Sequence, residues 1–262
     1  MYAQERQKQI LLQVKAAGRA SVNELAEGLG VSKATIRTDL TALEANGLIK
    51  RTHGGAIPAE EALAPAADTR LQEETLADRS NHAQKEAIAQ TALDLVDDGD
   101  IILIDSGTTA LAFAHELATS SLVGLVVYSN DFSVLYVLEG NTAISVNALP
   151  GKIRSGFHYA YGDSTIAALQ GAHFDKLFLT TSAIDFENGL TVVKPHLSNL
   201  KKTMIQASKQ VILLADSSKF GQTRFQKFAD LSEVDVIVTD AGISGADQAA
   251  TRATVGNLIL CP

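Results

Sequence analysis

The stretch SVNELAEGLGVSKATIRTDLTALEANGL, residues 21–48, decides how the N-terminal part of this chain folds. Its apolar residues recur at three- and four-residue steps in two successive segments, a spacing that predicts two short amphipathic helices. These residues are Leu25, Ala26, Leu29 and Val31 in the first segment and Ile36, Leu40 and Leu43 in the second.

Both predicted helices have start and stop signals. Ser21 and Ser32 precede the two apolar runs, and each hydroxyl can accept a hydrogen bond from an amide of the first helical turn. Gly30 and Gly47 follow the runs, where a left-handed residue favours glycine. The turn between the helices is therefore about three residues long, which is typical of a helix-turn-helix.

The outer surface of the second helix is basic and hydroxylated near its N-terminal end, where a recognition helix meets base edges in the major groove. The basic segment that precedes Gly54-Gly55 predicts a wing of two short strands along the sugar-phosphate backbone. A solvated face on an ordinary three-helix cluster is the alternative, but capping, turn length, basic face and wing together favour DNA binding. The predicted DNA-binding residues are Ser32, Lys33, Thr35, Arg37, Thr38, Lys50, Arg51 and His53.

These segments resemble the DNA-binding end of the DeoR family of bacterial transcriptional regulators. The matching runs are 31–40 (VSKATIRTDL), 43–44 (LE), 47–49 (GLI) and 51–56 (RTHGGA). The family usually has a second arginine where this chain has Thr38. The resemblance implies that the loss of this cation weakens one phosphate or base contact and leaves the helix intact.

Length and composition predict one small and one larger domain. The chain has 262 residues, 46% of them apolar, which is enough for a sizeable core. Its net charge of −8 is unevenly distributed: residues 1–57 hold eight basic and five acidic residues, a net of +3, which leaves −11 for the remainder. A basic head on an acidic body directs the attraction for DNA to one surface.

Several classes of protein are disfavoured by the sequence. Cys261 is the single cysteine, so there is no disulfide framework and no metal-ligand cluster, and we expect an inert thiol, no metal and no cofactor. No apolar run approaches the roughly 20 residues of a membrane-spanning helix. The start MYAQERQKQ lacks the apolar core of a signal peptide. We therefore expect a cytoplasmic protein without membrane contact.

The whole chain is predicted to consist of a winged helix-turn-helix domain over 1–57, a linker over 58–82 with a helical turn or two at 69–76, and an effector-sensing domain over 83–262. In the last part helices alternate with strands that are apolar on both faces, as in a covered parallel sheet. The fold class is α/β, with the DNA-binding domain followed by a doubly wound domain. Expected helices are 3–17, 83–97, 109–118, 131–138, 163–170, 196–208 and 246–252, and expected strands of the large domain are 101–105, 124–128, 143–148, 174–180, 210–215, 234–239 and 255–260.

Polar residues collect at the carboxyl ends of four of these strands, where open α/β sheets bind ligands. The Ser106–Thr109 loop combines a glycine with hydroxyls and free amides at a helix N-terminus, which suits a phosphate, although a helix cap without a ligand is equally open. Lys219 is placed to complete anion binding, and a solvated pair with Asp216 is the alternative. The predicted effector-binding residues are Asp105, Ser106, Gly107, Thr108, Thr109, Ser129, Asn130, Ser182, Lys201, Asp216 and Lys219.

The C-terminal part resembles the effector domain of the DeoR family, which is similar in fold to ribose-5-phosphate isomerase. The matching pieces are Lys85 with Ile88-Ala89, 99–100 followed by 105–109, Ser129-Asn130, 189–191, Lys201 with Met204, and 216–221. The departures from the family pattern are Pro150-Gly151, Ala183, Leu197 and Asn199. We expect the methyl group of Ala183 and the acids lost at 197 and 199 to reshape the sugar-facing side of the pocket and to spare the Ser106–Thr109 loop.

Two histidines leave alternatives open. His158, Tyr159 and Tyr161 follow the turn at 151–154 and form either a lid over the pocket or a plain exposed loop. His196 follows Pro195 at the start of a helix, where a ligand role is the less favoured interpretation.

Together these features predict a transcriptional regulator, a repressor of a sugar or polyol catabolic operon. It is expected to bind double-stranded operator DNA as a homo-oligomer, a dimer or a tetramer, under the control of a phosphorylated sugar. The main alternative is a sugar-phosphate isomerase-like enzyme with an appended DNA-binding head, in which Asp105, Asp216 and Lys219 supply acid and base. A scaffold with a vestigial pocket is a third. We expect no enzymatic activity, because the acids missing near Lys201 leave no carboxylate pair.

Overall fold

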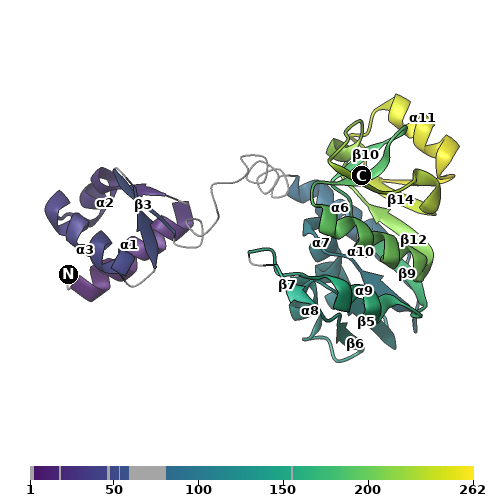
Figure 1. Cartoon of the computed structure of the whole chain (residues 1–262), viewed down its shortest axis with the longest axis horizontal. Coiled ribbons are helices and arrows are strands. Elements are labelled where there is room, and N and C mark those ends of the chain that lie inside the picture. Colours follow the sequence, from purple (N-terminus) through teal and green to yellow (C-terminus); the bar gives the residue numbers. More distant parts are fainter. Residues whose placement is uncertain (1–2, 18, 46–47, 53, 59–80, 155) are drawn as a thin grey trace. The chain divides into compact units, whose positions relative to one another are not determined.

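The computed structural model describes residues 3–17, 19–45, 48–52, 54–58, 81–154 and 156–262 (Figure 1). The chain divides into two compact units, one up to Gln72 and one from Glu73 onward. The predicted linker lies for the most part outside the described residues, as does its expected helical turn at 69–76.

In its described residues the N-terminal unit, called the head below, has three helices and a small antiparallel sheet with the strand order β1-β3-β2. Its elements are α1 (Ala3–Ala17), β1 (Ala20–Ser21), α2 (Val22–Leu29), α3 (Lys33–Ala45), β2 (Ile49–Arg51) and β3 (Gly55–Pro58). The first helix, the helix-turn-helix and the two strands of the wing are confirmed. The two-residue strand β1 is too short to show a period and was not predicted.

The predicted caps fix the ends of α2 and the start of α3. The Ser21 hydroxyl accepts a hydrogen bond from the Glu24 amide at 3.2 Å, and the Glu24 carboxylate accepts one from the Ser21 amide at 2.8 Å. Gly30 ends α2 with a φ of 65°, a conformation that glycine adopts without a steric penalty. The Ser32 hydroxyl then accepts a hydrogen bond from the Thr35 amide at 3.1 Å. The turn therefore covers residues 30–32, whereas Gly47 lies outside the described residues.

A polar contact holds α3 against α1 beside the apolar core of the head. Asp39 of α3 is buried, and its carboxylate accepts hydrogen bonds from Arg6 Nε at 2.6 Å and Nη2 at 3.3 Å, and from Gln7 Nε2 at 3.1 Å. The core itself contains Ile10, Val14, Leu25, Ile36, Leu40 and Leu43. With this side of α3 buried, its opposite side is left for solvent or for a partner.

The C-terminal unit is built on a seven-stranded parallel sheet with the strand order β15-β14-β12-β9-β4-β5-β6. The strands are β4 (Ile101–Ile104), β5 (Leu125–Ser129), β6 (Ile144–Ala148), β9 (Phe174–Leu179), β12 (Ser208–Leu214), β14 (Val236–Asp240) and β15 (Asn257–Cys261). The helices are α6 (His82–Leu93), α7 (Thr108–Ala118), α8 (Phe132–Leu138), α9 (Asp163–Leu169), α10 (Pro195–Gln206) and α11 (Gly245–Thr254), with the 3-10 helices η1 (Ser217–Lys219) and η2 (Leu231–Glu233).

The predicted elements of this unit are all present, and their ends agree to about two residues with one exception. Helix α6 ends at Leu93 and not at residue 97. After it the Asp100 carboxylate accepts a hydrogen bond from the Asp97 amide at 2.8 Å. Such local side-chain bonds compete with helical ones and favour a turn.

Helices cover both faces of the sheet. Because successive side chains of a strand point to opposite faces, Ile102 and Ile104 of β4 enter one core and Leu103 enters the other. Helices α6, α7 and α8 pack on the first core, and α9 and α10 pack on the second. The doubly wound α/β class is therefore confirmed.

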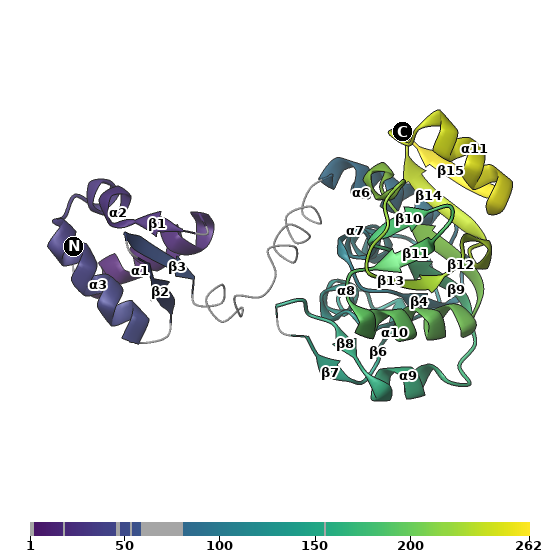
Figure 2. The same ribbon diagram turned by 45° about the horizontal axis from the view of Figure 1, so that its top comes forward.

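Two small antiparallel sheets were not predicted. One is the hairpin of β7 (Lys152–Ile153) and β8 (Ala160–Tyr161), and the other joins β10 (Ala183–Asp185), β11 (Gly189–Val192) and β13 (Gln226–Ala229) (Figure 2). Strands of two to four residues are too short for a clear alternation of apolar and polar side chains. Their position is therefore set by the long-range contacts that they make.

Cys261 is buried at the end of β15, and its thiol donates a hydrogen bond to the carbonyl of Thr239 at 3.2 Å. Burial raises the pKa of this thiol, which lowers the fraction of the reactive thiolate. Among the described residues, no helix is both long and apolar enough to cross a membrane.

Candidate functional site

The exposed side of α3 carries the residues predicted to meet DNA. Lys33, Arg37 and Thr38 are exposed and Thr35 is half-buried, whereas Ile36 faces the core. The helix therefore presents two cations and two hydroxyl-bearing side chains on one side, the combination that contacts phosphates and base edges.

Three hydroxyl groups of this region form hydrogen bonds within the head. The Ser32 and Thr35 hydroxyls lie 2.8 Å apart, and the Thr38 hydroxyl donates to the Ala34 carbonyl at 3.1 Å. Because the Thr38 proton is used within the helix, its methyl group is the part suited to a base, and a thymine methyl is the matching apolar surface.

The wing is fixed against α3 by Arg51. Its Nη1 donates to the Thr41 hydroxyl at 2.8 Å, and its amide donates to the Glu44 carboxylate at 2.8 Å. Lys50 and Arg51 are both exposed. Because Arg51 contacts Thr41, which is itself exposed, the wing adjoins the exposed side of α3. His53, the other residue predicted for the wing, lies outside the described residues.

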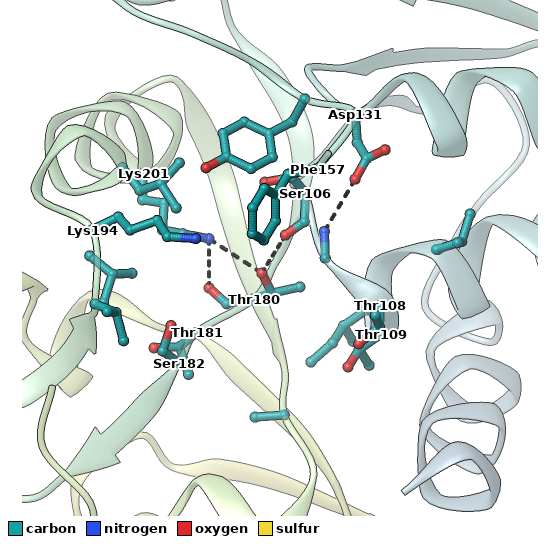
Figure 3. Close-up of a pocket in the computed structure, with 18 of the residues that line it drawn as sticks. Ser106, Thr108, Thr109, Asp131, Phe157, Thr180, Thr181, Ser182, Lys194 and Lys201 are labelled. Atoms are coloured by element: carbon teal, nitrogen blue, oxygen red, sulfur yellow. Dashed lines mark hydrogen bonds between the residues drawn. The ribbon is translucent and has the colours of Figure 1, made fainter. Parts of the chain in front are cut away.

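The C-terminal unit contains a cavity of about 310 Å³, a volume at the lower end of the range for small-molecule sites (Figure 3). The loops after β4, β5, β9 and β12 all contribute to its wall, together with the β7–β8 hairpin and the start of α10. The four strand ends that the sequence places together thus meet at one cavity. Its lining includes Lys85, Ser106, Gly107, Thr108, Thr109, Asp131, Phe157, His158, Tyr159, Thr180, Thr181, Ser182, Lys194, Leu197, Lys201 and Lys219.

The Ser106–Thr109 loop, called the phosphate loop below, leads from β4 into α7. Gly107 has a φ of 142°, and a Cβ atom at this position would lie 3.2 Å from Oγ1 of Thr180. Both facts favour glycine. Helix α7 begins at Thr108, so the amides of its first turn and the hydroxyls of Thr108 and Thr109 are beside the cavity (Figure 3). Amides at a helix N-terminus are suited to an anion.

Asp131 is an acidic member of the cavity wall beside the phosphate loop. Its carboxylate accepts hydrogen bonds from the Ser133 amide at 2.8 Å and from the Gly107 amide at 3.4 Å. Burial raises the pKa of this carboxyl, and the neighbouring Asp105 adds to the effect. One amide of the phosphate loop is thus engaged by a protein carboxylate in this structure.

Lys201 and Asp105 form a buried ion pair behind the phosphate loop, with side-chain exposures of 4% and 1%. Asp105 Oδ2 also accepts hydrogen bonds from the Thr180 amide at 3.0 Å and hydroxyl at 2.9 Å, and Lys201 donates to the Thr180 carbonyl at 3.0 Å. Lys201 lines the cavity, but its charge is compensated. The pair fixes Thr180 at the end of β9.

Seven of the predicted effector-binding residues line the cavity, and the other four are buried behind its wall. Those that line it are Ser106, Gly107, Thr108, Thr109, Ser182, Lys201 and Lys219, and those behind it are Asp105, Ser129, Asn130 and Asp216. Each of the four has an intramolecular partner: Ser129 accepts from the Asp131 amide at 3.0 Å, and Asn130 donates to the Ala160 carbonyl at 2.9 Å. These residues hold the loops that reach the cavity.

Several residues of the cavity wall were not predicted from the sequence as effector-binding residues. Lys85 is 5% exposed and lies on the apolar side of α6 with Ile88, Ala89 and Ala92, three, four and seven positions further on. A lysine in such a stripe was a usable signal, because lysine is rarely buried without a partner. Lys194 and Phe157 gave no comparable signal, because they come from irregular segments.

The structure corrects the expectation about the departures from the family pattern. Ala183 is buried in β10 and Asn199 is exposed on α10, and neither lines the cavity. Leu197 alone of the three does so. The His158–Tyr159 segment lines the cavity as well, whereas His196 lies behind it and its Nε2 is 3.2 Å from the Tyr159 hydroxyl.

A winged helix-turn-helix followed by an α/β unit with a ligand-sized cavity at its strand ends defines a class of transcription factors that bind DNA and sense a small molecule with one chain. Two family descriptions match this chain: "DeoR-like helix-turn-helix domain" over residues 6–62 and "DeoR C terminal sensor domain" over residues 80–241. The chain belongs to the DeoR family. It is a DNA-binding transcriptional regulator and not an enzyme.

The relatives match along nearly their whole length. The transcriptional repressor GlcR of Bacillus subtilis is 34% identical over 92% of this chain and 89% of its own. The regulator GlpR of Haloferax volcanii is 33% identical over 92% and 91%, and the repressor AccR of Agrobacterium fabrum is 31% identical over 91% and 90%. Among solved structures, ribose-5-phosphate isomerase from Methanocaldococcus jannaschii is 20% identical with a TM-score of 0.39 and covers 54% of this chain and 55% of its own.

Proposed function

We propose that the cavity binds a phosphorylated sugar and that this ligand controls operator binding by the head, in a repressor of a sugar or polyol catabolic operon. The head is assigned to residues 1–57, the linker to 58–82 and the sensing domain to 83–262. GlcR and AccR are relatives named as transcriptional repressors, which supports repression rather than activation of the operon.

One observation carries the proposal: the phosphate loop and two lysines from other elements line the same cavity. Lys219 comes from η1 after β12, and Lys85 comes from α6. A phosphate monoester carries a charge of about −1.5 to −2 at neutral pH and accepts several hydrogen bonds. Helix amides, hydroxyls and ammonium groups are the donors that such a group requires.

The sugar is expected to lie beyond the phosphate loop. Thr181, Ser182 and Tyr159 offer hydroxyl groups, and Asp131 offers a carboxylate that can accept a hydrogen bond from a sugar hydroxyl. This mixture of donors and acceptors suits a polyhydroxylated ligand more than an apolar one.

DNA binding is proposed to involve more than one head. A single head neutralises few phosphates, and the counterion contribution to affinity scales with their number. A homo-oligomer, a dimer or a tetramer, would present two heads to a pair of half-sites. For control, the ligand must bind one arrangement of the heads better than the other, and a tenfold effect requires about 1.4 kcal/mol of differential affinity.

The experiment combines a thermal-shift screen of sugar phosphates and their parent sugars with a gel-shift assay on operator DNA. Thr108→Glu should leave operator binding intact and abolish the response to the ligand, because its carboxylate would occupy the phosphate position. Ser164→Glu, on the exposed first turn of α9 and away from the cavity, is the matched control. A normal ligand response in Thr108→Glu would move the site elsewhere, and the absence of any stabilisation by sugar phosphates would contradict the proposal.

A further inference from the structure

Two cations lie close to the ring of Phe157: Lys194, which lines the cavity, and Arg154, which is not part of its lining. The Lys194 Nζ is 3.9 Å from the centroid of this ring, and the Arg154 Cζ is 4.5 Å from the same centroid. Two positive charges therefore lie beside one aromatic ring. Their separation is below the screening length of roughly 10 Å in 0.1 M salt, so they repel each other. An anion close to both cations would offset their mutual repulsion.

Lys194 stands where the local helix would favour a different residue. It is the N-cap of α10, and its side chain forms no cap hydrogen bond. N-caps favour serine, threonine, aspartate or asparagine, and a cation at the positive end of a helix is unfavourable. Because Lys194 lies at an unfavourable helix position in a cavity wall, ligand binding explains it better than helix stability does.

An aromatic cluster holds this region in place. Tyr159 lies 6.3 Å from Phe157 and 6.3 Å from His196 between ring centroids, and Tyr161 lies 4.6 Å from His196. The cluster joins the β7–β8 hairpin to the first turn of α10. Burial, Arg154 and Lys194 all lower the pKa of His196, so the positive field of the two cations is felt at this ring.

The two ends of the cavity are distinct. In Figure 3 the side chain of Lys194 enters from one side, and Thr108 and Thr109 of the phosphate loop lie on the other. A ligand with its phosphate on the loop would therefore extend its far end toward Lys194. Lys194 and Phe157 line the same cavity as that loop.

We propose that Lys194 in the cavity wall, together with Arg154 beside the same Phe157 ring, forms a second anion subsite, and that the effector carries an acidic group at the end opposite its phosphate. The inference rests on the proposed function, since it assumes that the first phosphate binds the phosphate loop. The ligand class is a sugar-acid phosphate or a sugar bisphosphate. Their shared chemistry is a second anionic group that accepts charge-assisted hydrogen bonds.

The test is calorimetric titration of the full chain with pairs of ligands that differ in one end group. Ribose 5-phosphate and glucose 6-phosphate are each compared with the acid that has a carboxylate at C1, and fructose 6-phosphate is compared with fructose 1,6-bisphosphate. In at least one pair the doubly acidic member should bind at least tenfold more tightly. The pair that shows the preference distinguishes a carboxylate from a phosphate as the second group.

Two variants assign the preference to the subsite. Lys194→Met and Arg154→Met should each reduce this preference to less than threefold, because the affinity for the member with a second acidic group falls more than the affinity for the monophosphate. Lys202→Met, the exposed neighbouring lysine on α10, is the matched control and should retain the preference. Circular dichroism spectra and melting temperatures of the variants show that loss of preference is not loss of fold.

The outcomes separate this inference from the proposed function. If sugar monophosphates without a second acidic group bind and no pair shows a preference, the second subsite is wrong and the proposed function stands. A preference that survives both Lys194→Met and Arg154→Met also overturns it. If no sugar phosphate of either kind binds, both proposals are wrong.

Discussion

The side-chain amide of Asn81 donates a hydrogen bond to Asp216 Oδ1 at 3.1 Å and lies 3.3 Å from the Ser218 hydroxyl. Asn81 lies near the end of the predicted linker and directly precedes α6, and its φ of 61° is unusual for a residue other than glycine. Asp216 is the N-cap of η1, the short helix that contains Lys219 of the cavity wall. A loop that touches the cavity is thus hydrogen-bonded to the end of the segment that leads into α6.

Asn81→Gly should uncouple the ligand from the DNA. Glycine keeps the left-handed backbone and removes the side-chain amide. The affinity for operator DNA without ligand and the affinity for ligand without DNA should each change less than threefold. The effect of the ligand on operator affinity should fall at least fivefold, because the coupling between the two sites is a free energy separate from either binding free energy. Gel shifts at a series of ligand concentrations measure all three. His82→Ala, one residue further and highly exposed, is the control. An undiminished ligand effect in Asn81→Gly would show that the signal takes another route.

Arg37→Ala and Lys50→Ala should weaken DNA binding in different ways. Arg37 lies on the exposed side of α3, and its loss should cost about 1–3 kcal/mol and relax sequence preference if it reads a base. Lys50 lies on the wing, and its loss should weaken binding to all sequences equally and reduce the salt slope by about 1. Fluorescence anisotropy at several salt concentrations with operator and unrelated DNA distinguishes the two. Equal behaviour of the two variants would contradict the assignment of α3 to the major groove.

Lys201→Met should destabilise the sensing domain strongly. It leaves Asp105 with an uncompensated buried charge, and removal of one partner of a buried ion pair costs about 3–5 kcal/mol. Asp105 Oδ1 has no hydrogen-bond partner among the described atoms, so the carboxylate depends on Lys201 and Thr180 through its other oxygen. Urea unfolding gives the free energy of unfolding. The double variant with Asp105→Asn should recover part of the loss, and Lys202→Met should cost little, because Lys202 is exposed. Equal stability of Lys201→Met and Lys202→Met would show that the pair is not important for folding.

Asp131→Asn should remove part of the pH dependence of stability. The pKa of Asp131 is raised above its ordinary value of 3.8, chiefly by burial, so the native state keeps this proton at pH values where the unfolded state has lost it. The contribution of Asp131 to the free energy of unfolding is therefore fully present below pH 3.8 and is lost as the pH rises through the raised pKa. Unfolding measured at half-unit steps from pH 3.5 upward should show a less negative slope for Asp131→Asn than for the unchanged protein. Asp163→Asn, an exposed carboxylate of α9, should keep the slope. Identical slopes for the protein and Asp131→Asn would contradict the raised pKa.

The sequence by itself determined the parts of this protein that depend on local periodicity. Apolar spacing and caps at Ser21, Gly30 and Ser32 set the helix-turn-helix, because they act within one or two helical turns. Strands apolar on both faces set the covered parallel sheet, and parallel strands bring their carboxyl ends to one edge. The position of the Ser106–Thr109 loop at the end of β4, beside the cavity, therefore followed from sequence alone.

Only the tertiary structure decided which polar side chains at that edge face the cavity. Asp105 turns inward because it binds Thr180 and Lys201, 75 and 96 residues away, and Asp216 does so because it binds Asn81, 135 residues away. Lys194 and Phe157 reach the cavity from segments that have no regular period. Beyond the last residue of a strand, the direction of a side chain is set by partners distant in sequence, and no local pattern contains that information.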